Sequence, residues 1–124
     1  DGMGMSDDVR AMLEQYNDAW NRHDVDAICA LHADGMVFEN HTAGERAEGD
    51  GVRDHIAAIF ENSPDLAFET RRLYATAELA VCEWTATATK GGQQVSWPGV
   101  DVFPLRDGRI ARKDVYSGSG RASR

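Results

Sequence analysis

Apolar residues in the first part of the chain recur with the spacing of an amphipathic helix. Val9, Leu13, Tyr16 and Trp20 are separated by four, three and four residues. This spacing places them on one face of a helix predicted over residues 6–21. That face is expected to pack against the rest of the domain.

Two further helices are predicted before the chain changes its pattern. Asp24 is positioned to cap a short helix that ends near Ala33, and Asp50 is positioned to cap a longer one. A short strand at residues 36–39 and a polar loop at residues 40–49 separate the two. The apolar face of the longer helix consists of Val52, Ile56, Ile59 and Phe60.

The second half of the chain alternates apolar and polar residues with the period of strands. The Asp107-Gly108 pair between the last two runs is typical of a tight hairpin turn. Consecutive hairpins predict an antiparallel sheet, and helices grouped near the N-terminus predict an α+β fold with the helices on one face. The predicted strands cover residues 66–75, 78–89, 94–105 and 109–117.

One acidic residue, Asp101, interrupts the apolar run over residues 97–105. The two-residue period places its side chain on the same face as Trp97 and Phe103. If that face is interior, the carboxyl group must find a partner or become neutral, because an unpaired buried charge is unfavourable. A neutral carboxylic acid in an apolar pocket can donate a hydrogen bond. The alternative is that Asp101 faces solvent or anchors a loop amide.

Length and charge restrict the domain organisation and the partners. The chain of 124 residues predicts a single domain over residues 6–117, with flexible ends at residues 1–5 and 118–124. The net charge of −8 argues against nucleic acid and against anionic membrane surfaces as partners. No apolar stretch approaches the roughly 20 residues of a membrane span.

The cysteines and histidines do not show metal-ligand spacing. Cys29 and Cys82 each lie in an apolar segment, which predicts free buried thiols in a reducing cytoplasm, with a disulfide as the alternative. No cluster suggests zinc, and Gly91-Gly92 is typical of a hairpin turn rather than of a phosphate-binding loop. We therefore expect a cytoplasmic protein without a metal or other cofactor.

Five short motifs in order resemble a known superfamily. They lie at residues 16–24, 37–40, 51–53, 99–103 and 106–110. Together they make the chain similar to the SnoaL-like polyketide cyclase and ketosteroid-isomerase branch of the nuclear-transport-factor-two-like superfamily, over roughly residues 6–117. The resemblance implies a curved antiparallel sheet wrapped around three helices, cone-shaped, with an interior pocket for a small apolar molecule. It also implies a homodimer formed through the outer sheet face.

The resemblance assigns expected roles to individual residues. Tyr16 and Asp101 fall at the positions of the tyrosine and the protonated aspartate that hold an enolate oxygen in ketosteroid isomerases. The catalytic base of that branch falls at Asn40, and an amide cannot act as a base near neutral pH. His41, Glu39 or Asp114 could supply the base instead. His41 and Glu39 would reach the cavity only if the chain bends there, and Asp114 would share a proton with Asp101.

These expectations leave three hypotheses about function. The first is an enzyme of isomerase or cyclase type that enolises an apolar carbonyl compound, and the second is a non-catalytic protein that binds a small apolar ligand. The third is a partner-binding dimeric domain of the same fold. Asn40 favours the binding protein over a true steroid isomerase. Tyr16 and Asp101 favour a protein with a ligand site over a domain that only binds a partner. The pocket walls are expected from Trp20, Phe38, Ile56, Trp84, Trp97, Phe103 and Tyr116.

Overall fold

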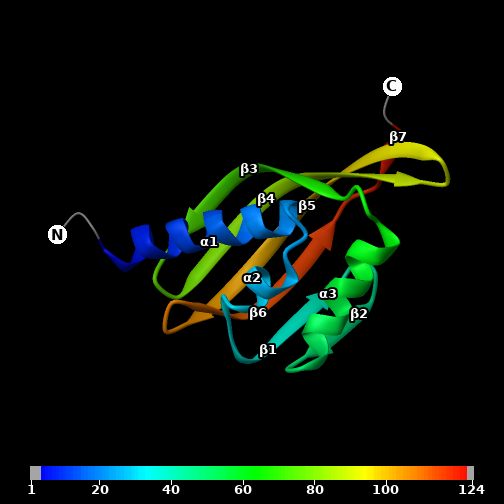
Figure 1. Cartoon of the computed structure of the whole chain (residues 1–124). Coiled ribbons are helices and arrows are strands. Elements are labelled where there is room, and N and C mark those ends of the chain that lie inside the picture. Colours follow the sequence, from blue (N-terminus) through cyan, green and yellow to red (C-terminus); the bar gives the residue numbers. More distant parts are fainter. Residues whose placement is uncertain (1–3, 123–124) are drawn as a thin grey trace.

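The computed structural model describes residues 4–122, which form three helices and a single curved sheet of seven strands (Figure 1). Met5 begins the first helix and Arg121–Ala122 forms a short last strand, although composition predicts flexible ends. The predicted ends at residues 1–3 and 123–124 lie outside the described residues. The elements are α1 (Met5–Asn21), α2 (Val25–Cys29), β1 (His32–Asn40), β2 (Glu45–Glu48), α3 (Gly51–Asn62), β3 (Ala67–Ala75), β4 (Leu79–Lys90), β5 (Gln93–Arg106), β6 (Arg109–Ser117) and β7 (Arg121–Ala122).

The sheet has the order β2-β1-β6-β5-β4-β3, with β7 beside β5. The predicted hairpins from β3 to β6 are confirmed, and Asp107 and Gly108 both have the positive φ of a tight hairpin turn. One pair departs from the antiparallel prediction, because β1 and β6 run parallel. Their distance along the chain explains this difference: no hairpin joins them, so only packing decides their relative direction.

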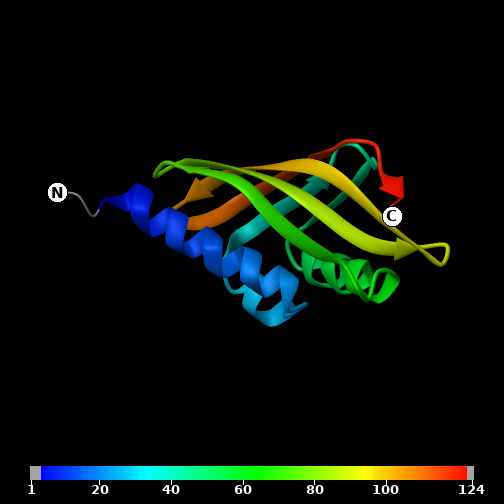
Figure 2. The same ribbon diagram turned by 90° about the horizontal axis from the view of Figure 1, so that it is seen from above.

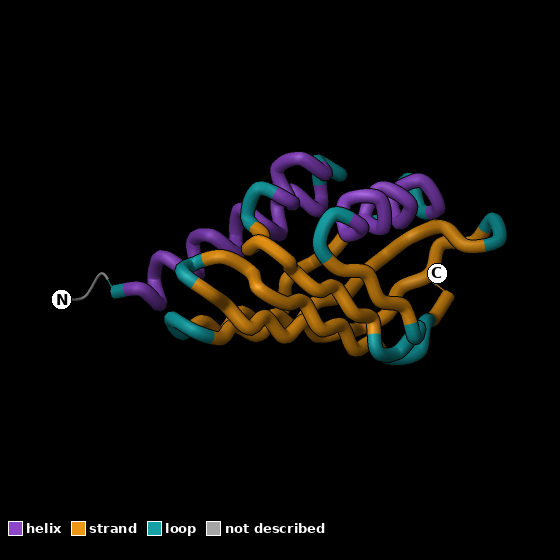
Figure 3. The backbone as a smooth tube through the Cα atoms, turned by 90° about the horizontal axis from the view of Figure 1, so that it is seen from below, coloured by secondary structure: helices purple, strands orange, loops and turns teal. Residues whose placement is uncertain are grey.

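All three helices lie on one face of the sheet (Figures 2 and 3). We call this face the inner face and the opposite one the outer face. The α+β fold with helices on one side of a curved sheet is therefore confirmed. Within residues 4–122, none of the helices is long and apolar enough to cross a membrane.

Helix α1 covers the inner face with the residues that its periodicity predicts. The Asn21 side chain at the end of α1 forms two hydrogen bonds with the backbone of Phe68 in β3. Its amide nitrogen donates to the Phe68 carbonyl (3.0 Å), and its amide oxygen accepts from the Phe68 N–H (2.8 Å). These bonds satisfy backbone groups of the edge strand β3, which would otherwise face solvent. The buried residues of the helix are Val9, Leu13, Tyr16, Ala19 and Trp20.

The segment after α1 is more extended than its pattern predicts. The Asp24 carboxylate caps α2 by accepting from the Ala27 N–H (3.0 Å), as expected. The helix nevertheless ends at Cys29, and His32 already begins β1, so the predicted helical end near Ala33 is wrong. The polar loop at residues 40–49 contains the short strand β2, which pairs with β1.

The central strands β4 and β5 position the interior. Cys82 and Trp84 of β4 face inward, and register places Cys82 opposite Asp101 and Trp84 opposite Gly99. Asp101 and Phe103 are buried on the same face, as the alternation predicts. The strand β5 thus carries a carboxyl group into the interior.

Gly99 leaves room for the Trp84 ring, which lies directly over it. A Cβ atom at residue 99 would come within 2.1 Å of Cη2 of Trp84. We expect Gly99→Ala to displace the indole and to lower the free energy of unfolding by about 1–3 kcal/mol, the usual effect of overpacking. Urea unfolding followed by tryptophan fluorescence measures this. The matched control is Gly51→Ala, where an added Cβ meets no atom within 4 Å. A Gly99→Ala protein as stable as this control would contradict the argument.

Strand β6 changes phase within its length. Val102 of β5 is opposite Asp114, whereas Leu105 is opposite Ile110, so the register slips by one residue between the two pairs. As a result Ile110 and Lys113 both face inward, although strict alternation would place them on opposite faces. Lys113 therefore reaches the interior and Asp114 does not.

Candidate functional site

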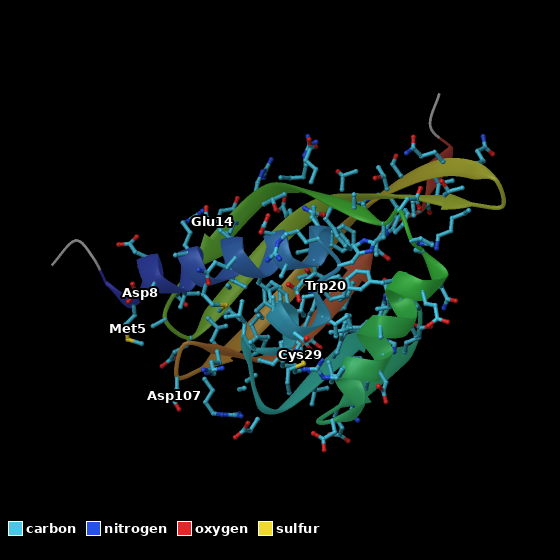
Figure 4. All side chains as sticks on the ribbon, viewed as in Figure 1. Met5, Asp8, Glu14, Trp20, Cys29 and Asp107 are labelled. Atoms are coloured by element: carbon cyan, nitrogen blue, oxygen red, sulfur yellow. The ribbon has the colours of Figure 1, made fainter. Side chains whose placement is uncertain are left out.

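A cavity of about 160 Å³ lies between the inner face of the sheet and helices α1 and α3. Figure 4 shows Trp20 at the end of α1 within this region. The walls are mainly apolar and aromatic, with a few polar side chains, as is usual for a small-molecule site. The lining residues are Asn17, Trp20, Phe38, Asn40, Glu45, Ile59, Leu66, Phe68, Thr70, Cys82, Trp84, Trp97, Asp101, Lys113 and Val115.

The two charged groups buried in this cavity are Asp101 and Lys113. Their side chains are 8% and 6% exposed, and Oδ2 of Asp101 lies 3.9 Å from Nζ of Lys113. This distance allows an ion pair but exceeds that of a hydrogen bond. Burial raises the pKa of Asp101, and the nearby Lys113 only partly offsets it. Burial likewise lowers the pKa of Lys113, partly offset by Asp101.

The carboxyl group of Asp101 retains an unused acceptor. Its Oδ1 atom is buried and makes no hydrogen bond to any of the described residues. The indole of Trp84 lies near enough to lower the pKa of Asp101, yet its N–H does not form a hydrogen bond of normal geometry. A polar group of a ligand could meet this oxygen, since unpaired buried acceptors are unfavourable.

Aromatic faces surround the Lys113 ammonium group. Nζ lies 3.8 Å from the ring centroid of Trp20, 5.0 Å from that of Tyr16 and 5.1 Å from that of Phe38. Such cation–π contacts stabilise the protonated form and offset part of its desolvation. The same rings exclude water from the amine, and this burial lowers the pKa of Lys113 and so favours its uncharged form.

Tyr16 is fully buried and does not line the cavity. Its hydroxyl group forms a 3.0 Å hydrogen bond with Nε2 of His32 in β1. Burial raises the pKa of Tyr16 well above its ordinary value, and the Asp101 charge raises it further. Burial also lowers the pKa of His32 to about 4, with a smaller contribution from Lys113. Tyr16 and Asp101 are therefore both buried, but only Asp101 lines the cavity, so the two side chains cannot together hold one ligand oxygen as the resemblance implied.

Asn40 lines the cavity near its rim. Its side-chain Oδ1 accepts a hydrogen bond from the Ala43 N–H (3.0 Å), which orders the turn after β1. Asn17 lies on the opposite wall and donates to Oγ1 of Thr70 (3.3 Å) and to Sγ of Cys82 (3.6 Å). These amides can orient a ligand but cannot remove a proton from it.

The alternative bases Glu39, His41 and Asp114 do not line the cavity. His41 and Asp114 form a 2.7 Å contact between Nε2 and Oδ1, and His41 stacks on Tyr116. Asp114 points to the outer face, because it is opposite Val102 rather than beside Asp101. The expected proton sharing between Asp114 and Asp101 is thus excluded by the register of β6.

The outer-face acidic side chains are neutralised by arginine. Arg112 donates to Asp114 through Nε (2.9 Å) and pairs with Glu39. Burial raises the pKa of Asp114, but hydrogen bonds from Arg112 and His41 together hold it below its ordinary value. Glu39, His41 and Asp114 are close enough together to bind a metal ion. The guanidinium group already supplies their positive charge, so the arrangement does not require one.

The predicted pocket residues divide into two groups. Trp20, Phe38, Trp84 and Trp97 line the cavity. Ile56 and Phe103 are buried in the core without lining it, and Tyr116 lies on the outer face with 45% of its surface exposed. Phe103 packs edge-to-face on Tyr16 instead.

Lys113 is a side chain of the candidate site that the sequence pattern did not reveal. Strict alternation along residues 109–117 places apolar Ile110 on the inner face and therefore assigns Lys113 to solvent. If Val115 instead of Ile110 is taken to face inward, the same alternation places Lys113 on the inner face, because residues 113 and 115 are two apart. The one-residue slip in β6 decides between the two phases.

Comparisons with known proteins agree with this architecture. The SnoaL-like domain family matches residues 13–113. The epoxide hydrolase/cyclase-like enzyme SalBIII, with a role in pyran ring formation in the polyether salinomycin, is similar in structure (TM-score 0.77, 23% identity, covering 89% of this chain and 90% of that one). A SnoaL-like protein from Burkholderia thailandensis has a TM-score of 0.74 at 22% identity, covering 90% and 95% of the two chains.

A further structure has the same fold. An NTF-2 like protein from Burkholderia xenovorans has a TM-score of 0.73 at 24% identity, covering 94% of this chain and 88% of that one. At these identities the structures establish the fold alone. No match to the chain was found among curated proteins. Because this match covers most of the sequence, the chain belongs to the SnoaL-like domain family.

Proposed function

We propose that the cavity binds a small, largely apolar carbonyl compound and that Asp101 and Lys113 transfer a proton on it, as in an isomerase or cyclase. The observation that supports this proposal is that the Asp101 carboxyl group and the Lys113 amine are both buried at the wall of an aromatic cavity. The environment moves both pKa values toward neutrality, which is the range in which acid–base catalysis is most effective.

The roles follow from the positions of the two groups. In the uncharged form of the pair, the Asp101 carboxylic acid donates a hydrogen bond to the carbonyl oxygen and stabilises the enolate that forms. The Lys113 amine accepts the α-proton and returns it at another carbon. Lys113 thus takes the part of the base that the resemblance placed at position 40, where this chain has an amide. Asp101 holds the carbonyl oxygen without Tyr16, whose hydroxyl group bonds His32.

The size of the cavity restricts the ligand. An apolar cavity of about 150 Å³ accommodates a molecule the size of benzene. This cavity, of about 160 Å³, therefore fits a single six-membered ring.

The second candidate is a binding protein that performs no reaction. Asn40 favours this candidate, because it has an amide at the position where the resemblance places a catalytic base. Such an amide can form hydrogen bonds that orient a ligand but cannot remove a proton from it. In that case Asp101 and Lys113 serve only to recognise a polar group.

We further propose a cytoplasmic homodimer that associates through the outer sheet face. Tyr74, Leu79 and Tyr116 are exposed large hydrophobic side chains on strands of this face. The free thiols of Cys29 and Cys82 are compatible with a reducing compartment.

Ligand binding is directly measurable because all three tryptophans line the cavity. We expect 2-naphthol to change their fluorescence saturably. We also expect wild type to convert cyclohex-3-enone to its conjugated isomer and Asp101→Asn to do so roughly 10²-fold more slowly, the usual contribution of a positioned acid or base. Absorbance of the conjugated ketone follows the reaction.

The control for this experiment is His41→Gln, which removes an outer-face group of similar chemistry. It should keep the wild-type rate. Binding of the probe with equal rates in wild type and Asp101→Asn would favour the binding protein over the enzyme. Absence of any binding would exclude both.

A further inference from the structure

Lys113 provides the cavity with a nucleophilic amine. Its Nζ is 3.9 Å from Oδ2 of Asp101, which is beyond the distance of a hydrogen bond. The thiol of Cys82, the other potential nucleophile, already accepts a contact from the Asn17 amide, and burial raises its pKa. A thiol with a raised pKa is a weak nucleophile near neutral pH.

The surroundings of Nζ favour reaction as an amine. It lies among the rings of Trp20, Tyr16 and Phe38, where burial lowers the pKa of Lys113. Desolvation of this kind is how lysines become nucleophiles toward carbonyl compounds. Asp101, the buried carboxyl group at this wall, can supply a proton within the same cavity.

We propose that Lys113 forms a Schiff base with the aldehyde or ketone group of a small apolar ligand, with Asp101 as the acid that removes the carbonyl oxygen as water. This inference rests on the proposed function, because it names the covalent route by which the same cavity would act on its carbonyl compound.

The chemistry balances with the two groups present. The Nζ lone pair forms a bond to the carbonyl carbon, the C=O π electrons move to oxygen, and a proton passes from nitrogen to that oxygen to give a carbinolamine. The Asp101 acid then protonates the hydroxyl group, the C–O bond breaks and water leaves. The products are a protonated imine on Lys113 and the Asp101 carboxylate, which is its counter-ion.

The protonated imine also compensates for the amide at position 40. It withdraws electrons from the α-carbon more strongly than a neutral carbonyl does, so a weak base suffices to remove the α-proton. The Asp101 carboxylate left by the preceding step is such a base. Removal of this proton gives an enamine, reprotonation at another carbon isomerises the ligand, and water hydrolyses the imine to release the product and restore both groups.

Reductive trapping tests this proposal sharply because the chain contains only two lysines, Lys90 and Lys113. Benzaldehyde is a suitable probe, since a single ring matches the cavity. With sodium cyanoborohydride at pH 7, we expect peptide mass spectrometry to find a benzyl group on Lys113 at least about tenfold faster than on Lys90. The reasons are that the cavity would hold the aldehyde beside Nζ of Lys113 and that burial lowers the pKa of this amine.

Lys90, the other lysine of the chain, serves as the internal reference. Lys90 lies near the surface, where its Nζ bonds Oγ of Ser63, and Lys90→Arg should leave the trapping at Lys113 unchanged. Lys113→Arg should abolish trapping at that position while Lys90 still reacts slowly. Excess cyclohexanone should compete with benzaldehyde at Lys113 and not at Lys90. Peptide mapping of the wild type gives the result even if Lys113→Arg does not fold.

The outcomes separate this proposal from the proposed function. Quenching of tryptophan fluorescence by benzaldehyde without trapping at Lys113 would overturn the covalent route alone. Equal trapping at both lysines would also overturn it, because it indicates unselective surface chemistry. Neither quenching nor trapping would overturn both the covalent route and the carbonyl ligand.

Discussion

Replacing Lys113 with methionine is expected to lower the free energy of unfolding by about 3–5 kcal/mol at pH 7. The change leaves the Asp101 carboxyl in the interior without its ion-pair partner, at 3.9 Å in the wild type. Keeping a carboxyl neutral at pH 7 requires about 1.4 kcal/mol for each pH unit above its unfolded pKa of about 3.9, which gives a similar magnitude. Asp101→Leu should have an effect of the same order, because it leaves Lys113 without a counter-charge.

The two single variants should depend on pH in opposite directions. In Lys113→Met, the folded pKa of Asp101 is raised above the unfolded value, so stability is complete at acidic pH and is lost as the pH rises through the folded pKa. In Asp101→Leu, the folded pKa of Lys113 is lowered, so the unfolded state binds more protons and stability falls as the pH decreases below about 10.

The double variant Asp101→Leu with Lys113→Met tests whether the pair acts as a unit. Replacing both members of a buried ion pair by apolar residues is often neutral or stabilising, so the double variant should be more stable than either single one. Urea unfolding at pH 5, 7 and 9 measures all four proteins, and surface Lys90→Met should change stability by less than about 0.5 kcal/mol. Additive losses in the double variant would show that the two groups do not interact.

Acidification is expected to destabilise the protein through His32. The pKa of this imidazole is about 4 in the folded protein, because of burial and Lys113, against about 6.5 in an unfolded chain. Between these values the unfolded state binds the additional proton, so the free energy of unfolding increases with pH across this window. Stability from this group is complete above about pH 6.5 and declines as the pH falls toward 4, by about 3 kcal/mol at most.

The His32→Gln variant isolates this contribution from the carboxylates that titrate in the same range. Its amide can still bond the Tyr16 hydroxyl, which His32 contacts at 3.0 Å, but it does not titrate. Unfolding curves at pH 7.5, 5.5 and 4.5 should therefore show a shallower pH dependence than the wild type. His41→Gln on the outer face is the matched histidine control. Parallel pH profiles of wild type and His32→Gln would show that the pKa of His32 is the same in the folded and unfolded states, which would contradict the prediction.

Much of the fold can be read from local patterns of the sequence. The spacing of Val9, Leu13, Tyr16 and Trp20 defines the buried face of α1, and the alternation in β4 and β5 places Trp84 and Asp101 inward. Turn residues such as Asp107-Gly108 locate the hairpins. These features depend on residues close together in the chain, where the periods of helix and strand and the preferences of turns operate directly.

The chemistry of the cavity was decided by contacts between distant segments. The slip between β5 and β6 turns Lys113 inward and Asp114 outward, and the bond to His32 turns the Tyr16 hydroxyl away from the cavity. Likewise, the parallel pairing of β1 with β6 brings Glu39 beside Arg112. Sequence alone placed Asp101 on the same face of its strand as Trp97 and Phe103, whereas the burial of its carboxyl group and the identity of its partner depended on the tertiary structure. The physical reason is that a one-residue change in strand register reverses every side chain beyond it, and cross-strand packing, not local sequence, sets that register.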